Sequence, residues 1–194
     1  PYAAGIDRRT GKTVWQIERT YGSMWTSPTL LPGGTTDKDL VLFQGRDVVS
    51  AHNPHTGAVV WSFSAPCHST SSVAADEKHV YLQAQGLNAI RPNPETGTAA
   101  LVWRELKLSS GAPSPLAHEG HVYVLRSSGI VVCARAEDGE MLWQLRLKGP
   151  FWATPVLADG RLYCVNHAGL VQVVELGEKG RLIAECQLDE GILG

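Results

Sequence analysis

The residues of this chain whose types could support chemistry are few and stand far apart. His118 and His121 have the His-x-x-His spacing of some metal sites, but the Glu-Gly between them is typical of a turn. Two imidazoles on a turn do not aim at one point as they do on a helix. Asp37 and Asp39 begin like a calcium-binding loop, yet neither the glycine at its sixth position nor the glutamate at its twelfth follows. With no nucleophile motif or acid–base pair recognisable either, the sequence predicts no catalytic residue and no metal site.

The four cysteines give no motif, since none forms a Cys-x-x-Cys pair. They are Cys67, Cys133, Cys164 and Cys186. The last three lie among apolar residues of expected strands, where a free cysteine behaves as a small buried hydrophobe. We therefore expect packed thiols, with a disulfide between neighbouring strands as the alternative.

Composition and charge narrow the classes of partner. The 194 residues are 43% hydrophobic and 19% charged, with a formal net charge of -2. No basic stripe supports nucleic-acid binding, and no apolar run reaches the roughly 20 residues of a membrane span. Because the chain opens on Pro1 without an initiator methionine, we expect a piece of a longer polypeptide, with any targeting segment outside it.

A recurring Thr-Gly-x-x-x-Trp pattern organises the rest of the chain. Its residues are Thr10, Gly11 and Trp15; Thr56, Gly57 and Trp61; Thr96, Gly97 and Trp103; and Gly139 and Trp143. The third copy is stretched by two residues, the fourth has Asp138 in place of threonine, and a fifth keeps only Gly180. The tryptophans are 46, 42 and 40 residues apart, a spacing typical of a repeat protein.

Each repeat reads as four short strands separated by turns. Segments that begin with Ser27, Ser71, Ser114 and Thr154 recur in phase, and each is followed by a polar turn and an alternating strand. Four strands in about 40–45 residues predict an all-β fold, a β-propeller of four-stranded antiparallel blades. The Asp or Asn before each Thr-Gly favours a tight turn, the glycine supplies a positive φ, and the tryptophan packs on the neighbouring blade.

The repeats divide the chain into an incomplete series of blades. We expect a partial blade at 1–20, complete blades at about 21–65, 66–107, 108–148 and 149–188, and the start of another at 189–194. An open arc would leave two unpaired sheet edges. We therefore expect the remaining blades of a larger ring, the alternative being terminal strands that pair to close a smaller one.

Candidate binding residues lie in the loops that differ between copies. The loop before a blade's first strand and the turn between its second and third strands share one face of a propeller, and variable loops on a rigid scaffold are where binding usually occurs. Trp25 and Trp152 lie outside the repeated motif. Together with Arg46 and His68 they are the expected ligand-facing residues, unless the aromatics only plug the central channel.

One copy of the motif carries a family resemblance. Residues 51–61 fit Ala-x-Asp/Asn-x-x-Thr-Gly-x-x-x-Trp at every fixed position, which resembles the tryptophan-docking motif of the pyrroloquinoline-quinone (PQQ)-like propellers. That family includes quinoprotein dehydrogenases, assembly lipoproteins of the BamB type and sensory repeat proteins. The resemblance implies a ring of seven or eight blades and an extracytoplasmic location, but it specifies fold more than function.

The expected function is non-catalytic binding or scaffolding, with a protein partner or small ligand on the face just described and no cofactor. One alternative is a fragment of a PQQ-dependent dehydrogenase. Many such enzymes carry an adjacent cysteine pair and a Glu/Asn/Asp calcium site beside the quinone, and this segment shows neither. A second alternative is a sensory domain of a larger signalling protein.

Overall fold

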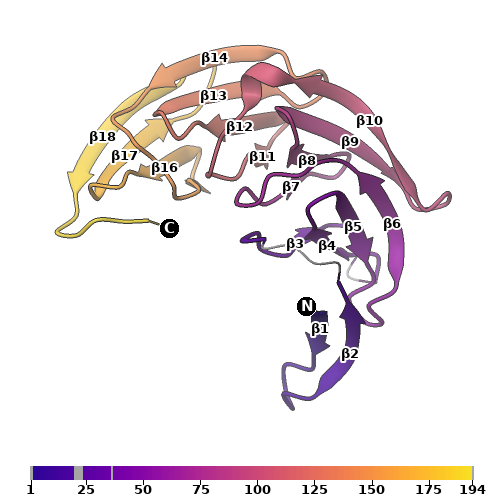
Figure 1. Ribbon diagram of the computed structural model, residues 1–194. Helices are drawn as coiled ribbons and strands as arrows, with labels where there is room; N and C mark the ends of the chain where they lie inside the picture. Colours follow the sequence, from indigo (N-terminus) through magenta and orange to yellow (C-terminus); the bar gives the residue numbers. More distant parts are fainter. Residues whose placement is uncertain (1, 20–23, 36, 194) are drawn as a thin grey trace.

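The computed structural model describes residues 2–19, 24–35 and 37–193, and almost all of its regular structure is β-strand (Figure 1). The strands are β1 (Tyr2–Ile6), β2 (Thr13–Glu18), β3 (Thr29–Leu31), β4 (Leu40–Gln44), β5 (Val48–His52), β6 (Val59–Ser64), β7 (Ala74–Ala75), β8 (Val80–Gln83), β9 (Leu87–Asn93), β10 (Thr98–Glu105), β11 (Leu116–His118), β12 (His121–Leu125), β13 (Ile130–Arg135), β14 (Met141–Arg146), β15 (Val156–Ala158), β16 (Arg161–Val165), β17 (Leu170–Glu175) and β18 (Arg181–Gln187). One short 3-10 helix, η1 (Leu106–Leu108), interrupts them, and no helix in the described ranges is long and apolar enough to cross a membrane.

The strands form blades that follow one another along an arc, with β2, β6, β10, β14 and β18 on its outer rim (Figure 1). After the hairpin β1–β2 come blade one (β3–β6), blade two (β7–β10), blade three (β11–β14) and blade four (β15–β18). Within each blade, consecutive strands pair antiparallel. The β-propeller predicted from the repeats is confirmed. Blades one and two form one continuous sheet, because a single parallel pair, Ser62 with Thr98, joins their outermost strands β6 and β10.

The Asp/Asn-x-x-Thr-Gly segments form the turns between third and fourth strands, as expected. Asp7 Oδ1 accepts hydrogen bonds from the backbone N–H groups of Arg9 and Thr10, at 2.9 and 2.8 Å, and Asn53 Oδ1 repeats this in blade one. The glycine that follows has a φ of 69° at Gly11 and 74° at Gly57. These side-chain bonds replace backbone partners in a tight turn, and glycine adopts the left-handed conformation without a Cβ penalty.

Three motif tryptophans contact the corresponding glycine of the next repeat. A Cβ atom added to Gly57, Gly139 or Gly180 would lie within 3 Å of a ring atom of Trp15, Trp103 or Trp143, respectively. Each indole N–H also donates to a backbone carbonyl of the next repeat, at 2.8–3.1 Å. The contact with Trp143 gives a physical reason why the fifth repeat keeps Gly180 although its own tryptophan is gone.

Trp61 departs from this arrangement where the next repeat is stretched. It is fully buried, but its Nε1 has no acceptor within the described part of the chain, and Gly97 does not meet its ring. The two extra residues before Trp103 lengthen β10 to eight residues, with a register shift between Leu101 and Trp103. Trp61 packs instead into the apolar core between blades one and two.

The apolar core consists of three layers, each between two successive blades. Successive side chains of a strand point to opposite faces of the sheet. Val80 and Leu82 of β8 accordingly pack toward blade one, while Tyr81 packs toward blade three. A blade buries both faces of its sheet only when it packs between two neighbouring blades. This packing holds consecutive blades in a fixed order.

A chain of hydroxyl contacts links the starts of the first strands. The backbone N–H of Ser27 donates to Ser72 Oγ, that of Ser72 to Ser114 Oγ, and that of Ser114 to Thr154 Oγ1, each at 2.9 Å. The equivalent of Ser27 in blade two is therefore Ser72, and the expectation that Ser71 opens this segment is wrong by one residue. Ser72, Ser114 and Thr154 all lie 11 residues after a motif tryptophan.

All four cysteines are free. Cys133 and Cys164 are buried, as predicted, and burial raises the pKa of the Cys164 thiol to about 12. The expectation of a packed thiol is wrong for Cys186, which lies exposed on β18. Every residue of this outermost strand is exposed, so the apolar residues next to Cys186 in the sequence do not bury its thiol.

Candidate functional site

Two kinds of loop meet on one face of the arc. The leading segment of a blade is the loop before its first strand, and it contacts the turn between second and third strands of its own or the preceding blade. Examples are the bonds from Cys67 N to Arg46 O at 2.7 Å, His68 N to Gln83 O at 2.8 Å and Phe151 N to Ser127 O at 2.9 Å. We call the surface formed by these segments and turns the leading face.

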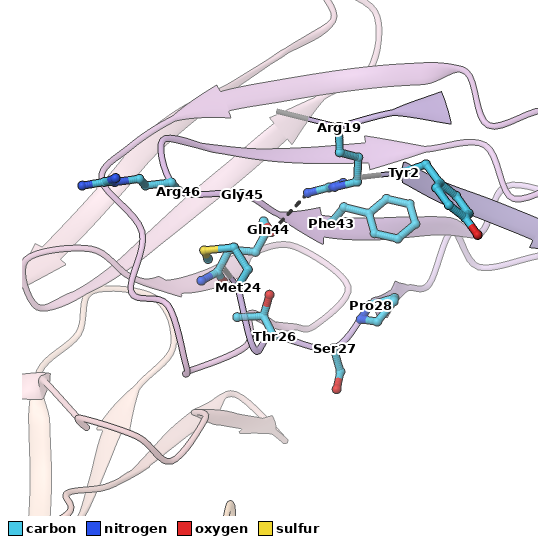
Figure 2. A pocket seen from close by; sticks show the side chains of 10 residues that line it. All are labelled: Tyr2, Arg19, Met24, Thr26, Ser27, Pro28, Phe43, Gln44, Gly45 and Arg46. Carbon is cyan, nitrogen blue, oxygen red and sulfur yellow. Dashed lines mark hydrogen bonds between the residues drawn. The ribbon is translucent and has the colours of Figure 1, made fainter. Parts of the chain in front are cut away.

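A cleft of about 200 Å³ opens on this face, where the hairpin β1–β2 meets blade one (Figure 2). Its walls are Tyr2 and Arg19, the leading segment of blade one, and the end of β4 with the turn that follows. The lining residues are Tyr2, Arg19, Met24, Thr26, Ser27, Pro28, Phe43, Gln44, Gly45 and Arg46. The leading segment and second turn therefore do come together, as the repeat alignment predicts.

Arg19 is fixed along one wall of the cleft. Its Nη2 donates to the backbone carbonyl of Gln44 at 3.1 Å, and its Cζ lies 4.8 Å from the centroid of the Phe43 ring (Figure 2). The ring face attracts the cation. Burial lowers the pKa of Arg19 below its usual value, and none of the ion pairs among the described residues includes it. The desolvation cost of a partly buried guanidinium is poorly compensated when no anion pairs with it.

The side chain of Gln44 carries an unused acceptor. Only 4% of the residue is exposed, and its Nε2 donates to the carbonyls of His68 and Ser71. Because both partners are acceptors, the amide nitrogen must face them, and the orientation of the amide is settled. Its Oε1 then has no donor in the part of the chain that the structure describes. Leaving a buried acceptor unpaired costs about 1–3 kcal/mol.

Three of the four predicted ligand-facing residues lie in this region. Arg46 lines the cleft, although Figure 2 shows its side chain extending away from Arg19. Trp25 is 71% exposed, and its backbone N–H donates to Ser69 O. His68 is exposed, supplies the carbonyl that Gln44 binds, and its Nδ1 lies 2.9 Å from Thr70 Oγ1.

The fourth residue, Trp152, belongs to the leading segment of blade four. It is 44% exposed, and its ring centroid lies 6.5 Å from that of His167. It does not line the cleft. Of the four residues, Arg46 alone lines the cleft, while Trp25 and His68 lie beside it in the chain and Trp152 belongs to a separate aromatic pair.

Sequence reasoning missed Arg19, Phe43 and Gln44. The signal for Arg19 was weak. The residue four positions after the motif tryptophan is buried and apolar in two repeats, Ala65 and Leu147, but it is the basic Lys107 in the third. Phe43 and Gln44 gave no such signal, since the end of a second strand is apolar or polar in different copies.

The opposite face carries a larger groove, of about 710 Å³, between blades two and three. At its wall Tyr81 Oη donates to Asp76 Oδ2 at 2.6 Å, and Arg91 Nη2 lies 3.2 Å from His79 Nε2. Burial lowers the pKa of His79, which is consistent with a neutral ring that accepts from Arg91. These bonds tie the β7–β8 turn to β9 and satisfy the polar groups that they bury.

The described side chains of the leading face offer cations, among them Arg19 and Arg46, and several hydrogen-bonding groups. No group of three His, Cys, Asp or Glu side chains that could hold a metal ion occurs in the described ranges. Burial, with the nearby Asp47 carboxylate, raises the pKa of Cys67 to about 11, so its thiol is protonated and weakly nucleophilic at neutral pH. The described residues of the leading face do not fit PQQ with calcium, because they include neither adjacent cysteines nor a cluster of carboxylates. His118 and His121 face each other as a registered pair across a two-residue turn, as predicted for a hairpin.

Blade architecture and repeat together define a β-propeller of the PQQ-repeat class. A family profile described as "Outer membrane protein assembly factor BamB" matches residues 2–106 and 93–185, and the chain belongs to this family. The outer membrane protein assembly factor BamB of Yersinia pestis is 26% identical over 196 residues, which cover 88% of this chain and 48% of that protein. The chain thus spans about half the length of this curated relative.

Solved structures show the same fold. The crystal structure of BamB from Moraxella catarrhalis matches with a TM-score of 0.69 and 21% identity, covering 98% of this chain and 59% of that one. The quinohemoprotein alcohol dehydrogenase from Comamonas testosteroni matches with a TM-score of 0.62 and 14% identity, covering 87% of this chain and 35% of that one. The resemblance to PQQ-like propellers is therefore confirmed, while these identities carry fold and not activity.

Proposed function

We propose that this chain is part of a non-catalytic binding propeller whose leading face holds a protein partner. The observation that carries the proposal is the cleft beside blade one, where the partly buried Arg19 guanidinium has no anionic partner among the described residues. A partner that covers the cleft gains affinity when it supplies an anionic group for Arg19. The relatives named as assembly factors support a scaffolding role.

The proposal extends to the rest of the molecule. We propose that further blades close the ring, since the relatives are about twice as long as this chain. An extracytoplasmic location is proposed on the same likeness to outer membrane protein assembly factors. In this account the stacked blades supply rigidity, and the variable loops of the leading face supply the contacts.

A dehydrogenase is the competing function, and it can be tested on the full-length protein. We expect that adding PQQ and Ca²⁺ and then desalting leaves no quinone absorbance with the protein, because the described residues lack the donors. We also expect no alcohol- or sugar-dependent reduction of a dye acceptor. A PQQ-dependent alcohol dehydrogenase reconstituted in parallel is the positive control. Retained quinone together with turnover would overturn the binding function.

A further inference from the structure

We propose that a basic patch on the leading face, formed by Lys107, Arg126 and Arg146, binds an acidic segment of a protein partner, and that Leu106 and Trp152 beside it contact apolar residues of the same segment. This inference rests on the proposed binding function and names the chemistry of the partner. It follows from cations that the fold gathers and that the chain itself leaves without a carboxylate.

The β12–β13 turn of blade three, residues 126–129, brings the three cations together, although they are about 20 residues apart in the sequence. On one side of the turn, Arg126 Nη2 donates to the backbone carbonyl of Lys107 in η1. On the other side, Arg146 Nη1 donates to the backbone carbonyl of Ser128 at 3.0 Å. Lys107 and Arg146 are exposed, and Arg126 between them is half-buried. The three residues therefore stand around one turn of the leading face.

No carboxylate of the chain pairs with the basic patch. None of the ion pairs among the described residues includes one of its members, and the remaining positions of the sequence contain no Asp or Glu. The segments that build the patch, 106–118, 125–136 and 141–158, contain no acidic residue either. Glu105 adjoins them, but its Oε1 accepts the backbone N–H of Lys107 at 3.1 Å and so caps η1. The positive charge of the patch is left for a partner to neutralise.

Other cations of the chain do find carboxylates. Arg135 Nη1, at the opposite end of the strands, lies 2.7 Å from Asp138 Oδ2, and Lys148 Nζ, beside the patch, lies 2.8 Å from Glu185 Oε2. The two guanidiniums of the basic patch bond to neutral backbone carbonyls instead. These bonds orient each guanidinium but leave its charge and its further N–H donors available, and a carboxylate can accept two of them in parallel.

Exposed apolar side chains beside the patch favour a polypeptide as the partner. Leu106, which precedes Lys107, is 67% exposed, and Trp152 is 44% exposed. Trp152 follows Phe151, whose backbone N–H donates to Ser127 O in the β12–β13 turn. Arginine and tryptophan are typical of the residues that contribute most to protein–protein affinity. A segment with acidic and apolar side chains can contact all of these groups, whereas a single inorganic anion cannot span them.

The charge count favours a protein over a membrane surface. Clusters that recognise anionic lipids contain roughly four to eight Lys or Arg residues, and this patch has three. A fixed guanidinium also suits a carboxylate in one defined orientation better than a fluid layer of headgroups. We therefore assign the patch to an acidic protein segment and use lipid vesicles as the competing arm of the test.

The test uses the full-length protein, with binding measured by isothermal titration calorimetry at low salt. The probes are the peptide acetyl-Asp-Glu-Leu-Asp-Glu-Phe-amide and its uncharged counterpart acetyl-Asn-Gln-Leu-Asn-Gln-Phe-amide. We expect the acidic peptide to bind tenfold or more tightly than the uncharged one, and its affinity to fall as salt is added, because exposed charges are screened. Vesicles of phosphatidylcholine and phosphatidylglycerol in equal parts are expected not to co-sediment with the protein.

The substitutions assign the site. Combining Lys107→Gln, Arg126→Gln and Arg146→Gln is expected to weaken binding of the acidic peptide at least tenfold, and Lys107→Gln alone about threefold, as the loss of one exposed ion pair does. Arg9→Gln removes one charge from the exposed turn of the β1–β2 hairpin and is expected to change affinity by much less than Lys107→Gln. Circular dichroism checks that each variant is folded. Lys107→Gln keeps both arginine–carbonyl bonds and decides the matter if the triple variant is unfolded.

Each contrary outcome points to one claim. Equal affinity for the two peptides, equal effects of Lys107→Gln and Arg9→Gln, or no binding of either peptide at millimolar concentration overturns the acidic partner. Co-sedimentation with the vesicles that Lys107→Gln weakens assigns the patch to a membrane surface and overturns it as well. None of these results bears on whether the protein retains PQQ or oxidises an alcohol, which is the outcome that overturns the binding function itself.

Discussion

Replacing Trp61 with alanine is expected to lower the free energy of unfolding by about 3–5 kcal/mol, as large-to-small changes of a buried tryptophan do. Trp61 is fully buried and packs on residues of both blade one and blade two. Its loss opens a cavity that the paired sheets cannot fill by a local shift. Urea unfolding followed by circular dichroism measures the change.

The matched control is Trp25→Ala, which removes the same side chain from an exposed position. Trp25 is 71% exposed, so its replacement is expected to change the unfolding free energy by no more than about 0.5 kcal/mol, the usual range for surface substitutions. Similar effects of the two substitutions would contradict the separation between packed motif tryptophans and exposed leading-face tryptophans.

Replacing Gly139 with alanine is the second change with a large expected effect. The residue has a φ of 78°, and an added Cβ would lie 2.8 Å from Cε3 of Trp103. The left-handed conformation costs an alanine about 1–2 kcal/mol, and overpacking against the ring adds about 1–3 kcal/mol. A fall of this combined size in the unfolding free energy is expected from urea titration.

Gly120→Ala separates the two causes. Gly120 lies in the same blade with a φ of 74°, but an added Cβ would meet nothing within 4 Å. It should therefore show the conformational cost alone. If Gly120→Ala is as destabilising as Gly139→Ala, the contact between Trp103 and the next turn contributes nothing, and the account of blade packing is wrong.

Much of the fold could be predicted because its determinants are local and repeated. A turn glycine, an Asp or Asn before it and a strand tryptophan recur at nearly constant spacing, and each has a conformational role within a few residues. Where one repeat differs, the prediction loses accuracy. The two residues inserted before Trp103 change the environment of Trp61 in the preceding blade. The sequence of either repeat alone does not predict this effect.

From the sequence, the position of the candidate binding site could be predicted only as one face of the propeller. Alignment of the repeats places Arg46 and the leading segment together, because the blade geometry is the same in every copy. The groups that make the cleft distinctive depend on contacts between repeats. Arg19 comes from the hairpin before blade one, and the amide nitrogen of Gln44 donates to carbonyls of His68 and Ser71 from blade two. No single repeat encodes that arrangement.

Site-specific photo-cross-linking of the full-length protein in its native cells tests whether the leading face binds a protein partner. A benzophenone side chain in place of Trp25 samples the leading face, and the same group in place of Glu119 samples the turn at the opposite end of the strands. We expect a discrete cross-linked protein adduct from position 25 that is absent from position 119. Adducts from position 119 alone, or from neither position, would contradict it.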